Sequence, residues 1–129
     1  MKIAAVQMIS GPDVRPNLDT ASRRIAEAVR AGARLVALPE YFPLIGATDE
    51  ARRAAREAPG TGPIQDFLAE TARAHGIWLV GGSIPLMPAT TRDPDKLLNS
   101  CLVFDDGGRQ VARYDKIHLF NFRKGDEHY

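Results

Sequence analysis

The stretch ARLVALPE, residues 33–40, is the part of the sequence that decides the fold. Its apolar run, residues 35–38, is closed by Pro39 and predicts a buried strand. The preceding residues 16–32 place apolar side chains at helical spacing and predict a helix. Residues 2–8 form another short apolar run, which predicts a first buried strand. Because strand, helix, strand connections are right-handed, we expect the two strands to be parallel in one sheet.

The same alternation of elements continues downstream. Residues 48–58 carry only alanines as apolar side chains, and Thr48 is a suitable N-cap, so they predict a surface helix. Residues 63–76 place apolar side chains on one face and predict a further helix that ends at a glycine. Residues 77–80 then predict another buried strand.

The last third of the chain predicts a hairpin. Residues 85–96 contain several prolines without any periodic pattern and are expected to form a loop. Residues 98–104 and 110–114 flank the turn sequence DDGG and predict an antiparallel pair. The whole order of elements indicates a layered α/β domain with a mixed sheet.

Composition narrows the class of protein. The 129 residues are 44% hydrophobic and 26% charged, which is typical of one ordinary globular domain. A formal net charge of +1 gives no electrostatic reason to expect nucleic acid or an anionic membrane as a partner. The first strand reaches polar Gln7 too soon for a signal peptide, and the single cysteine, Cys101, cannot form an internal disulfide. We therefore expect a cytoplasmic protein.

Two charged residues follow predicted strands. Glu40 comes directly after the strand at residues 35–38, and Lys116 follows the strand that ends near Tyr114. In open α/β sheets, ligands bind at the carboxyl ends of the strands, so both residues are candidates for a site. Considered alone, Glu40 could instead be a carboxylate that caps a turn or pairs with an arginine, and Lys116 could be an ordinary surface lysine.

Four blocks of the sequence together carry a family pattern: LPEYF at 38–42, GGSIP at 81–85, LNSC at 98–101 and YDKIHLF at 114–120. With AAVQM at 4–8, they resemble the nitrilase superfamily of carbon-nitrogen hydrolases, and most of all its omega-amidase branch. The resemblance covers nearly the whole chain. It implies an αββα sandwich with a mixed sheet, of which residues 1–129 are expected to be the N-terminal part of a single hydrolase domain.

The resemblance implies a Glu-Lys-Cys triad, in which Glu40 is the base and Lys116 the cation. It places the thiol nucleophile after the lysine block, and so beyond Tyr129. Cys101 lies upstream of Lys116 within an apolar strand, where we expect a buried, unreactive thiol. A second, assisting glutamate also follows the lysine in the family. Glu127 is near that place, but a residue beyond Tyr129 is the preferred candidate.

No metal or cofactor is expected. The three histidines, His75, His118 and His128, lack the paired spacing of a metal site. The glycines of GGSIP, residues 81–85, precede no GK pair and no predicted helix, so they do not indicate a phosphate-binding loop. The Glu-Lys-Cys chemistry that the resemblance implies needs only protein groups.

The resemblance thus implies a parent protein that hydrolyses a small linear amide and releases ammonia, and it also implies a homodimer. A nitrilase or an N-carbamoyl hydrolase with the same triad is an alternative. A different class is also open: a chain of 129 residues without the nucleophile would be a non-catalytic fragment or interaction module with an unpaired sheet edge. We expect the 129-residue chain alone to be inactive.

Overall fold

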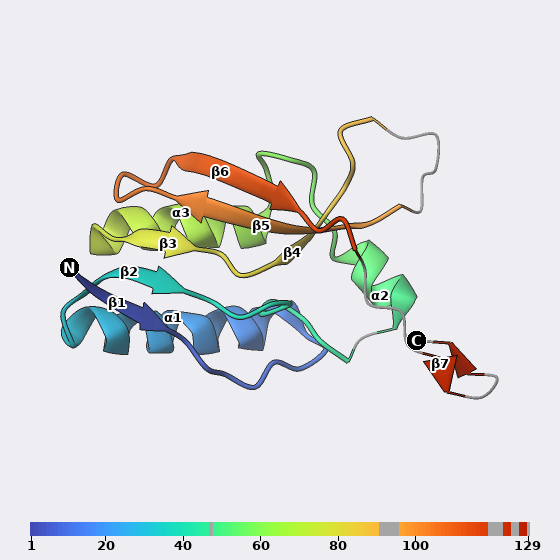
Figure 1. Cartoon of the computed structure of the whole chain (residues 1–129), viewed down its shortest axis with the longest axis horizontal. Helices are drawn as coiled ribbons and strands as arrows, with labels where there is room; N and C mark the ends of the chain where they lie inside the picture. The colour runs from blue at the N-terminus through green and yellow to red at the C-terminus, as the bar shows by residue number, and fades with distance from the viewer. Residues whose placement is uncertain (47, 91–95, 119–122, 125–126, 129) are drawn as a thin grey trace.

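A mixed β-sheet forms one layer of the molecule (Figure 1). The computed structural model describes residues 1–46, 48–90, 96–118, 123–124 and 127–128. The sheet strands are β1 (Lys2–Ala5), β2 (Ala33–Ala37), β3 (Trp78–Val80), β4 (Ile84–Leu86), β5 (Leu98–Phe104) and β6 (Gln110–Asp115). Two short strands, β7 (Arg123–Lys124) and β8 (Glu127–His128), pair only with each other among the described residues.

The strand pairing confirms the predicted mixed sheet. Strands β1, β2 and β3 are parallel neighbours, whereas β5 is antiparallel to β3, β4 and β6. Strands β3 and β4 lie end to end along one side of β5, and β6 lies along its other side. Consequently β2, β3 and β6 run in the same direction, and their carboxyl ends lie at the same end of the sheet.

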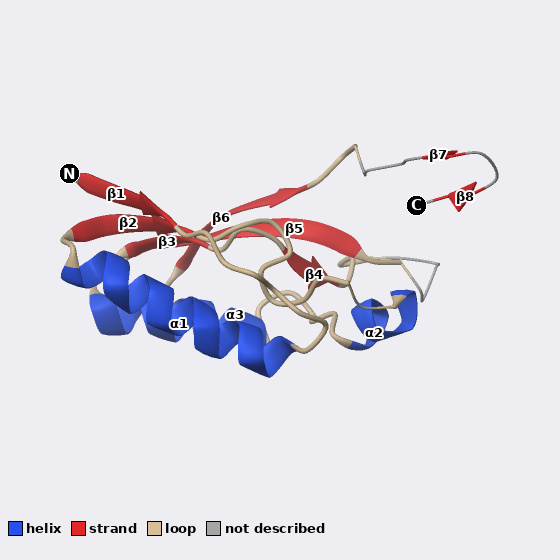
Figure 2. Cartoon of the chain, turned by 90° about the horizontal axis from the view of Figure 1, so that it is seen from below, coloured by secondary structure: helices blue, strands red, loops and turns tan. Residues whose placement is uncertain are grey.

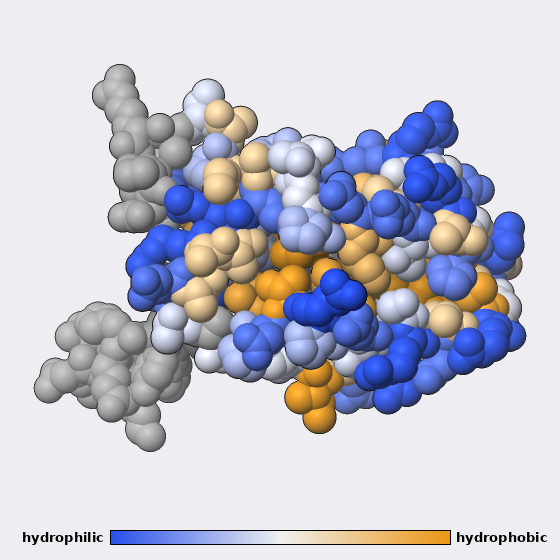
Figure 3. Space-filling view, turned by 180° about the vertical axis from the view of Figure 1, so that it is seen from behind, coloured by the Kyte–Doolittle hydropathy of each residue, from blue (hydrophilic) through white to orange (hydrophobic). Residues whose placement is uncertain are grey.

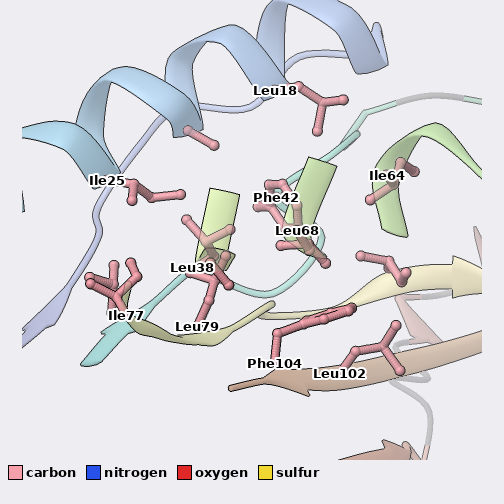
Figure 4. Close-up of a cluster of buried hydrophobic side chains, with 14 of the residues drawn as sticks. Leu18, Ile25, Leu38, Phe42, Ile64, Leu68, Ile77, Leu79, Leu102 and Phe104 are labelled. Atoms are coloured by element: carbon pink, nitrogen blue, oxygen red, sulfur yellow. The ribbon is translucent and has the colours of Figure 1, made fainter. Parts of the chain in front are cut away.

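Two long helices cover one face of this sheet (Figure 2). Helix α1 (Val14–Arg30) and helix α3 (Pro63–His75) both present the apolar positions that their spacing predicted, and α3 ends at Gly76 in the left-handed conformation. Their buried side chains pack on the sheet and form the core shown in Figure 4. Members of this core with 1% or less of their surface exposed are Ala21, Ile25, Ala33, Val36, Phe42, Ile64, Leu68, Ala72, Ile77, Leu79, Ile84, Leu86 and Leu102.

No helix of the described residues covers the other face of the sheet (Figure 2). Cross-strand pairing aligns Ile3 with Leu35 and Leu35 with Trp78, so the three side chains share this open face. Ile3 is 66% exposed and Trp78 43% exposed. The prediction that residues 2–8 form a buried strand was therefore wrong in two respects: β1 ends at Ala5, and as an edge strand it is largely exposed.

Two boundaries also differ from prediction. The proposed loop at residues 85–96 begins with β4, whose Pro85 lies opposite Asn99 of β5. The surface helix predicted at residues 48–58 is shorter: α2 (Asp49–Ala54) starts at the expected Thr48 N-cap but ends early. The backbone of Glu57 instead exchanges hydrogen bonds with β4, donating to Pro85 O and accepting from Met87 N. Pairing with β4 thus outcompetes the weak helical preference of this segment.

The outside of the helix layer is polar. Figure 3 shows hydrophilic side chains over most of the helix-bearing side, with apolar side chains visible mainly between the helices. Arg24 and Glu27 form an exposed ion pair on α1 at 2.8 Å, and Arg52 pairs with Asp49 on α2. In the described part of the chain, no helix is long and apolar enough to cross a membrane.

Candidate active site

A strained turn presents Glu40 at the carboxyl end of β2. Leu38 N still donates to Val80 O of β3, so the chain leaves the sheet only at Pro39. Tyr41, directly after Glu40, has a φ of 52°, a left-handed value that is uncommon for a residue other than glycine. Its main-chain N–H donates a 2.9 Å hydrogen bond to Ser83 Oγ, which holds the strained residue in place.

The break between β3 and β4 accommodates this turn. Gly82 has a φ of 59°, and a Cβ there would overlap the carbonyl oxygen of Pro39. Only glycine gives the backbone of residues 38–39 enough room to approach this closely. Gly81 N meanwhile donates to Leu102 O at 2.8 Å, so the ladder with β5 continues past the end of β3. The GG pair of the GGSIP block therefore seats the turn that carries Glu40.

Lys116 meets Glu40 from the other side of the site. It follows β6 directly, and its main-chain N–H donates to Asn99 O of β5 at 2.9 Å. Its Nζ lies 2.8 Å from Glu40 Oε1, although 76 residues separate the two in sequence. Asn99 Nδ2 donates to the same oxygen, also at 2.8 Å. One carboxylate oxygen thus accepts from an ammonium and from an amide.

These contacts favour the charged form of both groups. The hydrogen bond from Lys116, helped by the one from Asn99, holds the pKa of Glu40 below its ordinary value of 4.5, against the opposing effect of partial burial. The same hydrogen bond raises the pKa of Lys116 above its ordinary value of 10.5. At neutral pH the pair is therefore a carboxylate and an ammonium.

An open pocket of about 500 Å³ surrounds this pair. Its lining residues come from the carboxyl ends of β2, β3 and β6 and the amino end of β5, and include Glu40, Ser83, Asn99, Cys101, Tyr114, Lys116 and His118. The expectation of a buried Cys101 thiol was wrong as to burial, because the residue is half-buried and lines this pocket. Desolvation nevertheless raises the pKa of its thiol, which reduces its reactivity.

Two contacts of the site were missed by sequence reasoning. The sequence analysis named Asn99 and Ser83 only as members of the blocks LNSC and GGSIP and assigned neither residue a role. The available signal was Asn99 itself, a polar side chain 4% exposed within the apolar strand β5. For Ser83, the signal was a hydroxyl directly after two glycines at a strand end.

Glu127 and the histidines were also considered from the sequence. Glu127 belongs to β8, and its side chain lies outside the described residues. His118 lines the pocket, whereas His75 is the last residue of α3. Within the described ranges, no three His, Cys, Asp or Glu side chains are grouped so that they could hold a metal ion.

The chain thus has a mixed sheet with helices on one face. A carboxylate and an ammonium meet at the carboxyl ends of its strands. The family model described as carbon-nitrogen hydrolase matches residues 2–129, and the chain belongs to this family. Among curated proteins, it is 36% identical over 126 residues to the deaminated glutathione amidase of Yersinia enterocolitica. It is 38% identical over 120 residues to an omega-amidase of Xenopus laevis.

The solved structures agree with this assignment. The Saccharomyces cerevisiae protein Nit3, a member of branch 10 of the nitrilase superfamily, superposes with a TM-score of 0.74 at 30% identity over 85% of this chain. That match covers 41% of the yeast chain. The alignments to the Yersinia and Xenopus proteins cover 98% and 93% of this chain, but only 43% and 41% of those relatives. The chain therefore spans less than half the length of each of these three relatives.

Proposed function

We propose that residues 1–129 are the N-terminal part of a single hydrolase domain, and that the whole protein cleaves the non-peptide C–N bond of a small linear amide. The observation that carries this proposal is the 2.8 Å contact between Lys116 Nζ and Glu40 Oε1 at the edge of an open pocket. Family membership supports the reaction class. The roles of the two residues follow from their chemistry.

Glu40 is the proposed general base. Its lowered pKa keeps the carboxylate ionised at neutral pH, ready to accept a proton from a thiol. The thiolate sulfur bonds to the amide carbonyl carbon, and collapse of the tetrahedral intermediate breaks the C–N bond. Glu40 passes the thiol proton to the departing nitrogen, which leaves as ammonia. It then takes a proton from the water that attacks the thioester and returns it to the sulfur.

Lys116 is the proposed electrostatic stabiliser. An ammonium has three N–H donors, and only one of them is needed for the contact with Glu40. The others can face the negative oxygen that develops on the former carbonyl group. One such fixed donor contributes about 3 kcal/mol to the stability of the transition state. The ion pair therefore combines a base and an oxyanion partner within a single hydrogen-bonded unit.

The nucleophile of this proposal is a cysteine outside residues 1–129, in the part of the whole protein that follows Lys116. Cys101 is unsuited to the role, because desolvation raises the pKa of its thiol. Thiol labelling of the whole native protein distinguishes a nucleophile outside residues 1–129 from Cys101. We expect one fast-reacting thiol besides a slow Cys101. Fast labelling of Cys101, with no other fast thiol, would contradict the proposed triad.

An amide is the preferred substrate because the Yersinia and Xenopus relatives are both named as amidases. No feature of the pocket favours a nitrile or an N-carbamoyl compound. We also propose a cytoplasmic homodimer. The family resemblance supports the dimer, and the lone cysteine is compatible with a reducing compartment. The molar mass of the whole protein in solution tests the dimer directly.

The principal experiment is ammonia release from small amides by the whole protein and its Glu40→Gln and Lys116→Met variants. Both changes keep the approximate side-chain size, and each removes one charge. We expect a loss of at least about 100-fold in kcat/KM for each. Glu70→Gln and Lys96→Met are matched controls, because both side chains are exposed and outside the pocket. Near-normal activity of Glu40→Gln would remove Glu40 from the mechanism.

A further inference from the structure

Asn99 contacts both partners of the ion pair. Its side-chain Nδ2 donates to Glu40 Oε1 at 2.8 Å, and its main-chain oxygen accepts from Lys116 N at 2.9 Å. The residue is 4% exposed and belongs to β5, which has β6 on one side and β3 and β4 on the other. A single rigid residue thus connects the two segments that carry opposite charges.

The amide of Asn99 is incompletely satisfied. Its Oδ1 is buried and has no hydrogen-bond partner in the described part of the chain. Turning the amide over would not help, because Oδ1 would then face the carboxylate of Glu40. An unpaired buried acceptor destabilises a fold, and an apolar residue at this strand position would avoid that loss. The side-chain hydrogen bond that Asn99 makes in the described part of the chain is the one to Glu40.

We propose that Asn99 is a positioning residue that fixes the Glu40 carboxylate in the orientation needed for proton transfer. This inference rests on the proposed function, since it assumes that Glu40 is the base. The Nδ2 donor occupies one side of Oε1 while Lys116 occupies another. The carboxylate, on a side chain that is 53% exposed, therefore has little freedom to rotate. A reacting group that is misplaced by about 1 Å can lose about 100-fold in rate.

The contact also affects the charge of Glu40. The hydrogen bond from Asn99 stabilises the ionised form and adds to the stronger effect of Lys116 in lowering the pKa of Glu40. The other ionisable groups that line the pocket are Cys101, Tyr114 and His118. Loss of the Asn99 donor should consequently move the acid limb of the rate profile to higher pH.

The test uses the whole protein with Asn99→Leu and Asn99→Asp, both close to asparagine in size. We expect kcat/KM to fall about 10- to 100-fold in each. The acid limb should move to higher pH in both, and further in Asn99→Asp, which adds a like charge beside Glu40. Asn99→Leu should unfold at a urea concentration close to that of the wild type, because it removes the unpaired Oδ1 together with one donor to Glu40. A purely structural asparagine would instead lose stability without moving the acid limb.

Ser100→Ala is the matched control, because Ser100 is fully buried on the same strand but its hydroxyl donates to Asp115 Oδ1. It should leave the acid limb in place. An unmoved acid limb in both Asn99 variants would overturn the inference while Glu40→Gln remained inactive. An active Glu40→Gln would instead remove the proposed base, and with it the premise of the inference. If Asn99→Asp fails to fold, Asn99→Leu alone decides the question.

Discussion

Tyr41 N and Ser83 Oγ are joined by a 2.9 Å hydrogen bond that links the turn after β2 to the start of β4, across 42 residues of sequence. The bond matters because Tyr41 holds a left-handed φ, which destabilises a non-glycine residue by roughly 1 to 3 kcal/mol. The hydroxyl of Ser83 thus stabilises the conformation that directs Glu40 toward Lys116.

Replacing Ser83 by alanine should destabilise the protein by roughly 1 to 3 kcal/mol, because a part-buried N–H loses its acceptor. Urea unfolding measures this loss. Ammonia release should fall as well, since Glu40 directly precedes Tyr41, whose N–H loses this acceptor. Ser22→Ala is a suitable control because Ser22 is exposed on α1. Equal stability of the two variants would show that Ser83 does not support the turn.

Alanine at Gly82 should have a larger effect. A Cβ there would overlap Pro39 O and approach Leu38 O to 2.7 Å, in addition to the strain of a positive φ. Overpacking and strain together should destabilise the fold by roughly 3 kcal/mol or more. Gly60→Ala separates the two contributions, because Gly60 also has a positive φ but no atom within 4 Å of the added Cβ. Similar unfolding midpoints for both variants would contradict the close approach.

Glu57 should be important for stability and not for the reaction. Its carboxylate, 6% exposed, accepts hydrogen bonds from Ile64 N at 2.5 Å and from Gln65 N at 3.0 Å at the start of α3. Glu57→Gln removes the charge that favours a helix N-terminus and should destabilise by roughly 1 to 3 kcal/mol. Glu50→Gln, in the exposed first turn of α2, is the matched control in thermal unfolding. A larger loss in that control would refute the capping role.

The stabilising effect of the Glu40–Lys116 pair should be lost both in acid and in base. The pKa of Glu40 is lowered, so its stabilising effect is present above about pH 4.5 and disappears as the pH falls through its folded-state value. The pKa of Lys116 is raised, so its effect is present below about pH 10.5 and disappears as the pH rises through its folded-state value. Both side chains are partly exposed, so the stabilisation is modest.

A double-mutant cycle with Glu40→Gln and Lys116→Met tests this dependence. We expect a favourable coupling free energy of unfolding near pH 7, declining in acid as Glu40 takes up a proton. High salt should weaken the coupling at neutral pH. A coupling that stays constant into strong acid would mean that the two charges do not interact as the 2.8 Å distance indicates.

The parts of the fold that the sequence predicted well are those with strong periodicity. Helices α1 and α3 and the hairpin of β5 and β6 repeat apolar residues at their natural spacing, so local pattern and tertiary structure agree. Strand β4 was missed because Pro85 reads as a loop residue, although proline is tolerated where it donates no ladder bond. The exposure of β1 depends on which strand lies at the edge, which local pattern does not encode.

The candidate site was predictable only in part. Glu40 and Lys116 stood out because each follows a strand, and their 2.8 Å contact agrees with the expectation that the strand ends converge. Their catalytic roles remain a prediction. The contact of Asn99 with Glu40 spans 59 residues and depends on the order of strands in the sheet. Only the three-dimensional arrangement shows it.

The uncovered face of the sheet has a spectroscopic consequence. Trp78 is the only tryptophan of the chain, and it lies on this face with 43% of its surface exposed. Its indole fluorescence therefore reports whether water or protein lies against the sheet. Contact with another apolar surface would shift the emission to shorter wavelength and protect the ring from quenchers dissolved in water. The protein thus contains its own optical probe for the covering of this face.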